Sequence, residues 1–163
     1  MKSIPVLLVV AVLALSACTQ ADHSTEDMKA QMRKNVDAVW NKGNMDIIDD
    51  VYAADYVRHN PASWEPATVE GAAAFKEFLG TIHSIYNNDF HVEIHDIVME
   101  GDMSASRWTV TGTLKENGKE VKLEGLNMIR SQDGKIAEEW ISWDTQAYMQ
   151  LMAPGEEAET TMK

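Results

Sequence analysis

The sequence predicts an α+β fold in which helices pack in the concave face of a curved antiparallel or mixed sheet. The first half of the chain repeats its apolar residues at spacings of three and four, as helices do. From Phe90 onward the spacing changes to two, which is typical of strands. Helices in one half and strands in the other indicate an α+β architecture, and a sheet wrapped over helices leaves a conical hollow. A concave apolar hollow is the default place for a ligand.

The N-terminus has the pattern of an export signal. Lys2 is followed by an apolar run that ends at Leu15, shorter than the roughly 20 residues that a membrane-spanning helix needs. The run leads into Leu-Ser-Ala-Cys at Cys18, which resembles the lipobox of bacterial lipoproteins. The resemblance implies that residues 1–17 are removed, that Cys18 becomes lipid-modified, and that residues 18–24 form a tether. The alternative is an ordinary signal peptide with a chance cysteine.

The lipobox resemblance also implies an exported protein that reaches the membrane through its lipid anchor only. Thr19 follows the cysteine where an Asp would indicate inner-membrane retention in enteric bacteria, so we expect the periplasmic face of the outer membrane. One acyl chain binds membranes only marginally, and additional chains make the anchor stable. Cys18 is the only cysteine, so no intramolecular disulfide is possible.

The remainder of the chain has the size of one domain. Residues 25–153 suffice for a single core, and residues 154–163 are expected to form a flexible acidic tail. The sequence contains 26 acidic and 14 basic residues, with a formal net charge of -12. Nucleic acid and anionic membrane surfaces are therefore poor partners, because both are bound through basic patches that release counterions.

Three helices are expected before the sheet, and a fourth at the end of the domain. The first three cover residues 24–43, 45–52 and 69–86, each with an apolar stripe that is typical of core packing. The fourth follows Asp144, which is among the best residues for an N-cap.

A short strand at residues 55–60 stops at Pro61, because proline cannot donate a ladder hydrogen bond. His59 and Asn60 stand at the end of this strand. They could point into a pocket, or they could be turn residues that satisfy local backbone groups. The pattern favours neither alternative.

His91, Glu93 and His95 alternate along the next strand and share one face. Imidazole and carboxylate groups suit zinc, but successive residues on one face lie roughly 6.5 Å apart, which hinders convergence on one ion. A solvated outer face explains them better, and we expect no metal site.

The C-terminal hairpin carries the first chemical hint. Asp133-Gly134 joins two apolar-rich runs and predicts paired antiparallel strands. By alternation, Trp140 and Asp144 lie on one face of the second strand. A carboxyl group beside an indole in a partly dry cleft can exchange protons near neutral pH. Asp144 could equally cap the terminal helix, and the two roles do not exclude each other.

The same alternation creates a conflict at Glu138, which would share the face of Trp140. A second unpaired carboxylate in a pocket is costly. Either a bulge between Ala137 and Glu139 resets the alternation, or Arg107 faces inward and pairs with Glu138. We expect the inward Arg107.

These motifs resemble the SnoaL-like polyketide cyclases of the NTF2-like superfamily, whose fold is an α+β cone. The resemblance spans residues 28–152. It is carried by residues 55–61, by Glu100-Gly101-Asp102 before Arg107-Trp108-Thr109, by Asp133-Gly134-Lys135-Ile136 and by Trp143-Asp144-Thr145-Gln146.

The resemblance implies that Asp144 is the acid/base of a ring closure and that Asn60 lies beside it. The antibiotic cyclases carry Gln and His at the positions of Gly125 and Asn127. These two departures put polyketide cyclisation itself in doubt, so the resemblance supports the fold more firmly than the reaction.

Three hypotheses for function follow. The first is a cofactor-independent ester cyclase, lyase or isomerase for a small hydrophobic carbonyl compound, which needs no metal. Asp144 would move a proton, and Asn60, Asn127 or His59 would hydrogen-bond the developing oxyanion. We expect the substrate-binding residues to be His59, Asn60, Arg107, Asn127 and Trp140. The second hypothesis is a non-catalytic binding lipoprotein for a small apolar ligand, and the third is a homodimer built on the outer face of the sheet.

Overall fold

The computed structural model describes residues 25–153 in two compact units, which are treated separately. Within the first unit, residues 25–34 are helical, and the Lys29 ammonium group donates to the Glu26 carboxylate at 2.7 Å. The second unit begins at Asn35. The export signal, the tether with the lipidation site Cys18, and the acidic tail lie outside the described residues.

The described helices of the second unit are short, apart from one. They are the π-helix η1 (Val36–Asn41), the 3-10 helix η2 (Met45–Ile47), and the α-helices α2 (Ile48–Val51), α3 (Ala72–Ile85) and α4 (Thr145–Met152). Helix α3 buries Phe75 and Leu79, which are members of the apolar stripe.

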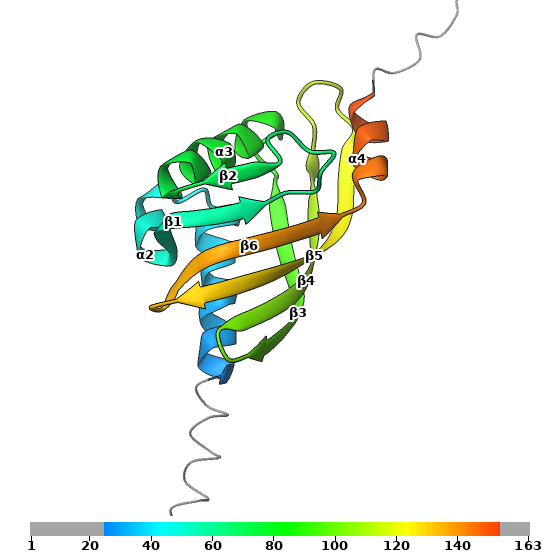
Figure 1. Ribbon diagram of the computed structural model, residues 1–163. Coiled ribbons are helices and arrows are strands. Elements are labelled where there is room, and N and C mark those ends of the chain that lie inside the picture. The colour runs from blue at the N-terminus through cyan, green and yellow to red at the C-terminus, as the bar shows by residue number, and fades with distance from the viewer. Residues whose placement is uncertain (1–24, 154–163) are drawn as a thin grey trace, which may run out of the picture. The chain divides into compact units, whose positions relative to one another are not determined.

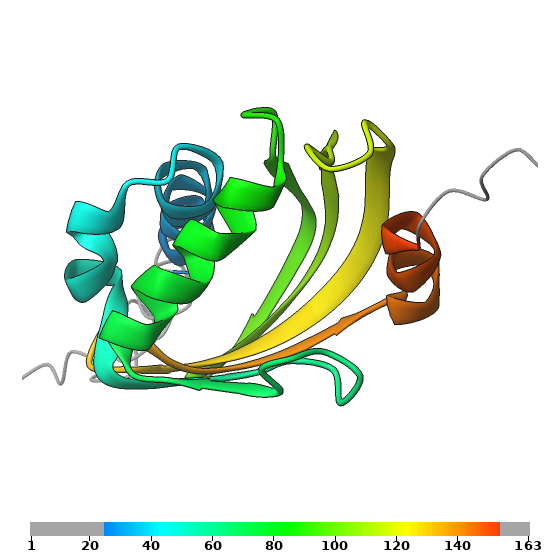
Figure 2. The same ribbon diagram turned by 90° about the horizontal axis from the view of Figure 1, so that it is seen from above.

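Six strands form one mixed sheet in the order β2-β1-β6-β5-β4-β3. The strands are β1 (Tyr52–His59), β2 (Thr68–Glu70), β3 (His91–Glu100), β4 (Met103–Thr113), β5 (Glu120–Gln132) and β6 (Lys135–Trp143). Strands β3 to β6 form an antiparallel meander, and β1 pairs with β6 in parallel. Helix α3 lies over the concave face of the curved sheet, and α4 follows the end of β6 (Figures 1 and 2). The predicted α+β fold is therefore confirmed.

One edge strand was not predicted. Val69 was placed in the third helix, but it lies in β2, and the helix begins at Ala72. Gly71 separates the two elements with φ of 87°, a left-handed backbone that glycine adopts without steric cost. The apolar period of the helix thus continued by chance into a strand.

A bulge in β6 resolves the conflict at Glu138. The β5–β6 register steps from Arg130↔Glu138 to Ser131↔Ile136, so Ala137 is an extra residue on β6. Beyond this bulge Glu139 turns into the core, where it is 5% exposed, and Glu138 points outward. The bulge was the alternative that the sequence left open.

The inward placement expected for Arg107 is wrong. Its guanidinium is half exposed and bonds to Asp96 at 2.8 Å on the outer face. Glu138 instead meets Arg130 at 3.1 Å and His59 at 3.0 Å. Because the bulge had already turned Glu138 outward, no inward cation was needed.

Candidate functional site

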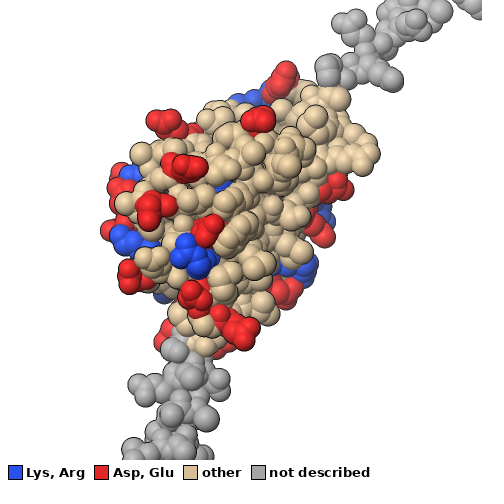
Figure 3. Space-filling view, viewed as in Figure 1, with Lys and Arg blue, Asp and Glu red and all other residues tan. Residues whose placement is uncertain are grey.

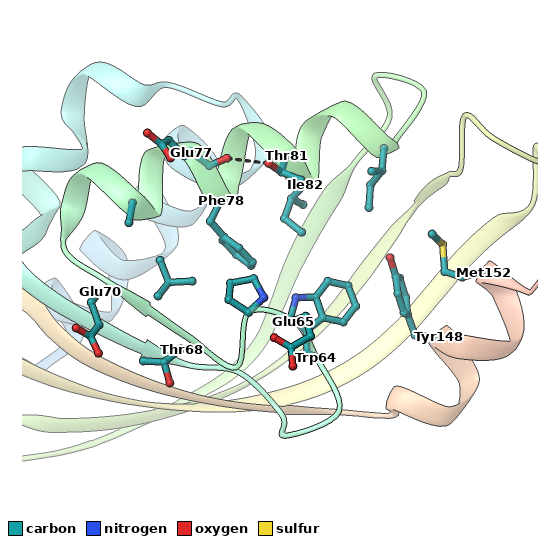
Figure 4. A pocket seen from close by; sticks show the side chains of 14 residues that line it. Trp64, Glu65, Thr68, Glu70, Glu77, Phe78, Thr81, Ile82, Tyr148 and Met152 are labelled. Carbon is teal, nitrogen blue, oxygen red and sulfur yellow. Dashed lines mark hydrogen bonds between the residues drawn. The ribbon is translucent and has the colours of Figure 1, made fainter.

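The candidate site is a groove of about 490 Å³ along helix α3. Its other walls are strand β2, the loop before it, and helix α4. Its apolar and aromatic lining includes Trp64, Pro66, Phe78, Ile82, Tyr148 and Met152. Figure 4 shows that the side chains of Phe78 and Ile82 point from α3 toward Trp64. The groove is thus mainly apolar, as ligand sites usually are.

Aromatic rings hold one end of the groove. The ring of Trp64 lies 4.7 Å from that of Tyr148 and 5.2 Å from that of Trp143. Trp143 in turn lies 6.4 Å from Trp108 at a steep angle. In the structure, Trp64 belongs to the wall of the groove and also packs on the core.

The charges at the groove are all negative. Glu65, Glu70 and Glu77 are exposed lining residues, and none of the described lining residues is Lys, Arg or His. On the face that Figure 3 shows, acidic and basic side chains surround an uncharged area that extends toward helix α4. An anionic ligand would therefore meet like charge at the edge of the groove.

A buried ion pair lies behind the groove. Arg58 of β1 and Glu139 of β6 are direct partners in the parallel register, and each is 5% exposed. The guanidinium Nη1 donates to Glu139 Oε2 at 2.7 Å, and the Tyr56 hydroxyl donates to the same oxygen at 2.6 Å. The second carboxylate oxygen accepts from the Asn127 amide at 2.7 Å. Both oxygens of the buried carboxylate are thus satisfied.

The pair belongs to a longer chain of contacts, which we call the buried network. It comprises Tyr56, Arg58, Asn60, Ser106, Asn127 and Glu139. The Ser106 hydroxyl donates to Asn127, and the Arg58 Nε donates to the Asn60 side chain at 2.9 Å. Such a network is stable only when every member has its partners.

The charges of the network fix its protonation. Burial by itself lowers the pKa of Arg58, but the Glu139 carboxylate raises it, and the net shift is upward. Burial and then the charge of Glu139 raise the pKa of Tyr56 well above its usual value. Arg58 therefore stays charged and Tyr56 stays a hydrogen-bond donor across the whole range of ordinary pH.

The buried network also holds two walls of the groove. The Arg58 guanidinium lies 5.2 Å from the centre of the Phe78 ring and 4.9 Å from that of Trp40, within reach of cation–π attraction. The Asn60 amide donates to the Pro66 carbonyl at 2.9 Å. Phe78 and Pro66 line the groove, so the ion pair fixes its shape from behind.

Asp144 lies outside the groove lining. Its side chain is exposed and accepts from the Ala147 backbone N–H at 2.9 Å, which makes it the N-cap of α4. The capping alternative is therefore observed, while the dry surroundings expected for an acid/base group are not. Proton transfer by Asp144 stays a prediction.

Trp140 and His59 lie on the outer face rather than in a pocket. Their rings stack at 5.4 Å with an interplanar angle of 11°, and Trp140 is 37% exposed. The expected inward placement of Trp140 is wrong, because the bulge shifts the alternation of β6 by one residue. Asn60 and Asn127 do lie inside, but as members of the buried network.

The sequence analysis missed Arg58, Tyr56 and Glu139. A signal existed for two of them, since Tyr56, Arg58 and Asn60 follow one another at a spacing of two and so share a strand face. Glu139 offered no such signal, because its direction depends on the bulge.

No group of three or more potential metal ligands occurs among residues 25–153. His91 and Glu93 are exposed, and the His95 imidazole instead contacts the Thr109 hydroxyl at 2.7 Å. None of the helices in this part of the chain is both long and apolar enough to cross a membrane.

Comparison with protein families adds the decisive finding. The model of the SnoaL-like polyketide cyclases matches residues 30–151, three quarters of the chain. The chain belongs to the SnoaL-like polyketide cyclase family. A search of curated protein sequences found no match.

Solved structures show the same fold as this SnoaL-like domain. A candidate SnoaL-like polyketide cyclase from Jannaschia sp. CCS1 is similar with a TM-score of 0.68 at 17% identity, over 78% of this chain and 94% of its own. A candidate polyketide cyclase from Acidithiobacillus ferrooxidans reaches 0.66 at 25% identity, over 76% and 93%. IdmH from Streptomyces antibioticus, also a candidate polyketide cyclase, reaches 0.62 at 23%, over 76% and 98%.

The buried ion pair yields a prediction. Arg58→Met leaves Glu139 charged and without its cation, so we expect a loss of about 3–5 kcal/mol in the free energy of unfolding, measured in urea. Adding Glu139→Leu to Arg58→Met removes the stranded charge and should recover most of the loss.

A matched control uses an ion pair at the surface. Lys76 contacts Asp49 at 2.7 Å with the Asp49 side chain 67% exposed, and Lys76→Met should cost less than about 1 kcal/mol. An Arg58→Met variant as stable as this control would contradict a structural role for the pair.

Proposed function

We propose that the SnoaL-like domain binds a small apolar carbonyl compound in the groove beside helix α3. The observation that carries the proposal is the groove itself, which is concave, lined by aromatic and aliphatic side chains, and held from behind by the buried network. Proteins of this family bind small hydrophobic ligands, which supports the proposal.

Filling the groove tests this proposal. The probe is tetralin, a small bicyclic hydrocarbon. Ile82→Trp places an indole where Figure 4 shows Ile82 facing Trp64, and we expect the affinity for tetralin to fall at least tenfold. Ser84→Ala, two residues along α3, is the control, because Ser84 is exposed, lies outside the groove lining and donates to the Thr81 carbonyl of its own helix. Isothermal titration calorimetry measures both. Equal affinity in the wild type and Ile82→Trp would exclude the groove as the binding site.

Membership of the family favours a second candidate, acid/base catalysis of a cyclase, lyase or isomerase type with Asp144 as the proton carrier. The exposed position of Asp144 and its contact with Ala147 favour binding without chemistry. The two candidates differ in what they require of the carboxylate. A cap needs only an oxygen that accepts a hydrogen bond, whereas acid/base catalysis needs a group that takes up and releases a proton.

Asp144→Asn separates the two candidates, because asparagine also caps helices but cannot carry the proton. We expect Asp144→Asn to keep both stability and groove binding, whereas Asp144→Ala should lose about 1 kcal/mol of stability. Thermal unfolding and calorimetry provide the measurements. A substrate whose turnover the wild type catalyses and Asp144→Asn abolishes would establish the catalytic candidate instead.

We further propose that the protein works at the cell envelope, anchored through a lipid on Cys18. The support is the sequence Leu-Ser-Ala-Cys after an apolar run. Fractionation of cells that produce the wild type or Cys18→Ala tests the anchor. The wild type should be found with membranes and the variant in the soluble periplasmic fraction, and identical distributions would contradict the proposal.

The outer sheet face supports a homodimer as a further proposal. One row of neighbouring residues crosses four strands and consists of Val98, Ala105, Met128 and Trp140. Val98 is 66% exposed, Met128 50% and Trp140 37%. Two ion pairs flank this uncharged row, Arg107–Asp96 and Arg130–Glu138, and the charges cancel within each pair. A second copy would therefore meet little repulsion there. Light scattering should give the mass of a dimer, and of a monomer for Met128→Glu; a monomeric wild type at high concentration would exclude the proposal.

A further inference from the structure

The phenol of Tyr148 stands at one end of the groove. Its side chain comes from the first turns of α4, and the residue is only 7% exposed. The Tyr148 backbone N–H donates to the Asp144 carbonyl at 3.2 Å, and the ring rests against Trp64. In Figure 4 the hydroxyl points away from α4, toward the side of the groove that helix α3 forms. The cap of α4 and the indole of Trp64, tilted by 59° against the ring, thus fix this hydroxyl within the groove.

The hydroxyl makes no hydrogen bond to another group of residues 25–153, and it is not among the fully buried unpaired side-chain atoms of this range, so it is open to the groove that Tyr148 lines. The two buried phenols of β1, by contrast, have partners within the protein. Tyr56 donates to Glu139 at 2.6 Å, and Tyr52 accepts from the Trp40 indole N–H at 3.3 Å. A phenol that lines the groove without a partner in the protein is free to donate to a polar atom of a ligand.

The chemistry of the groove limits what that ligand atom can be. Burial raises the pKa of Tyr148, so the phenol remains protonated and available as a donor. Glu65, Glu70 and Glu77 around the groove disfavour a carboxylate or phosphate as the acceptor. A ketone, aldehyde or ester oxygen accepts a hydrogen bond without bringing a negative charge.

We propose that the Tyr148 hydroxyl is the polar anchor of the groove and donates a hydrogen bond to the carbonyl oxygen of a neutral apolar ligand. The inference rests on the proposed function, and it adds the residue that orients the ligand and the class of compound that the groove selects. A donor at the carbonyl oxygen also polarises this bond, which is the interaction that any acid/base reaction at the neighbouring carbon would need.

A pair of probes that differ only in the carbonyl tests the anchor. α-Tetralone and tetralin have the same bicyclic skeleton, and each is titrated against the wild type, Tyr148→Phe and Tyr86→Phe by calorimetry. Tyr86→Phe is the matched control, because Tyr86 is also buried but does not line the groove. We expect the wild type and Tyr86→Phe to bind the ketone about 3- to 10-fold more tightly than the hydrocarbon, the range for one neutral hydrogen bond. In Tyr148→Phe this ratio should fall to about one, with the affinity for tetralin unchanged.

A spectroscopic measurement follows the same hydrogen bond directly. The carbonyl stretch of bound α-tetralone should lie at lower frequency in the wild type than in Tyr148→Phe, because a hydrogen bond weakens the C=O bond.

The carboxylate tetralin-1-carboxylate should bind more weakly than the ketone, and it should gain affinity when Glu65, Glu70 and Glu77 are all replaced by Gln.

The outcomes separate the anchor from the proposed function. If tetralin and α-tetralone bind the wild type equally well, or if the ratio survives in Tyr148→Phe, the anchor is wrong and the groove remains a binding site. If neither probe binds the wild type at millimolar concentration, both the anchor and the proposed function are wrong. A melting curve of Tyr148→Phe like that of the wild type confirms that the variant is folded.

Discussion

The buried pair of Arg58 and Glu139 is the interaction on which the rest of the domain depends. It joins β1 to β6 at the only parallel contact in the described sheet, where the two residues are direct register partners. Removing two charges from water is expensive, and the mutual attraction offsets that cost only when hydrogen bonds satisfy the remaining atoms. Tyr56 and Asn127 provide these bonds, so four strands, β1, β4, β5 and β6, are tied to one carboxylate through side chains that include Ser106. The pair therefore specifies the arrangement of the sheet as much as it stabilises it.

The same pair connects the sheet to the groove. The guanidinium faces the ring of Phe78 on α3, and its Nε holds Asn60, which in turn holds the carbonyl of Pro66. Phe78 on α3 and Pro66 in the loop before β2 both line the groove, so contacts inside the core fix their positions without a ligand. Such a groove is preorganised, and a ligand that enters it loses little free energy to ordering the protein.

The sequence predicted most of the helices and strands, but it did not predict which way the side chains of Trp140 and Arg107 point. The Asp133-Gly134 turn, with φ values of 52° and 77°, and the cap at Asp144 follow from local chemistry, which a sequence shows plainly. The bulge at Ala137 depends on how β6 meets its neighbours, and one extra residue reverses every side chain beyond it. Trp140 was therefore expected inside, opposite to the structure, and the inward direction of Glu139 was missed. The role of Tyr148 was equally hidden, since it arises from contacts between α4, α3 and the loop of Trp64.

The position of the groove follows from how the inside of the cone is filled. Gly125 of β5 faces inward, and a Cβ atom there would collide with the six-membered ring of Trp108. By the family resemblance, the antibiotic cyclases have a Gln at this position. A side chain of that size at position 125 would need the space that the Trp108 ring occupies here. Trp143 packs on Trp108, and Trp64 packs on Trp143, which extends the aromatic cluster from the sheet to the loop. Beside these indole rings the groove lies between α3 and α4, and the Tyr148 hydroxyl is one of the polar groups of its lining. We therefore expect a ligand to lie beside the helices, and we do not expect a reaction inherited unchanged from the cyclases.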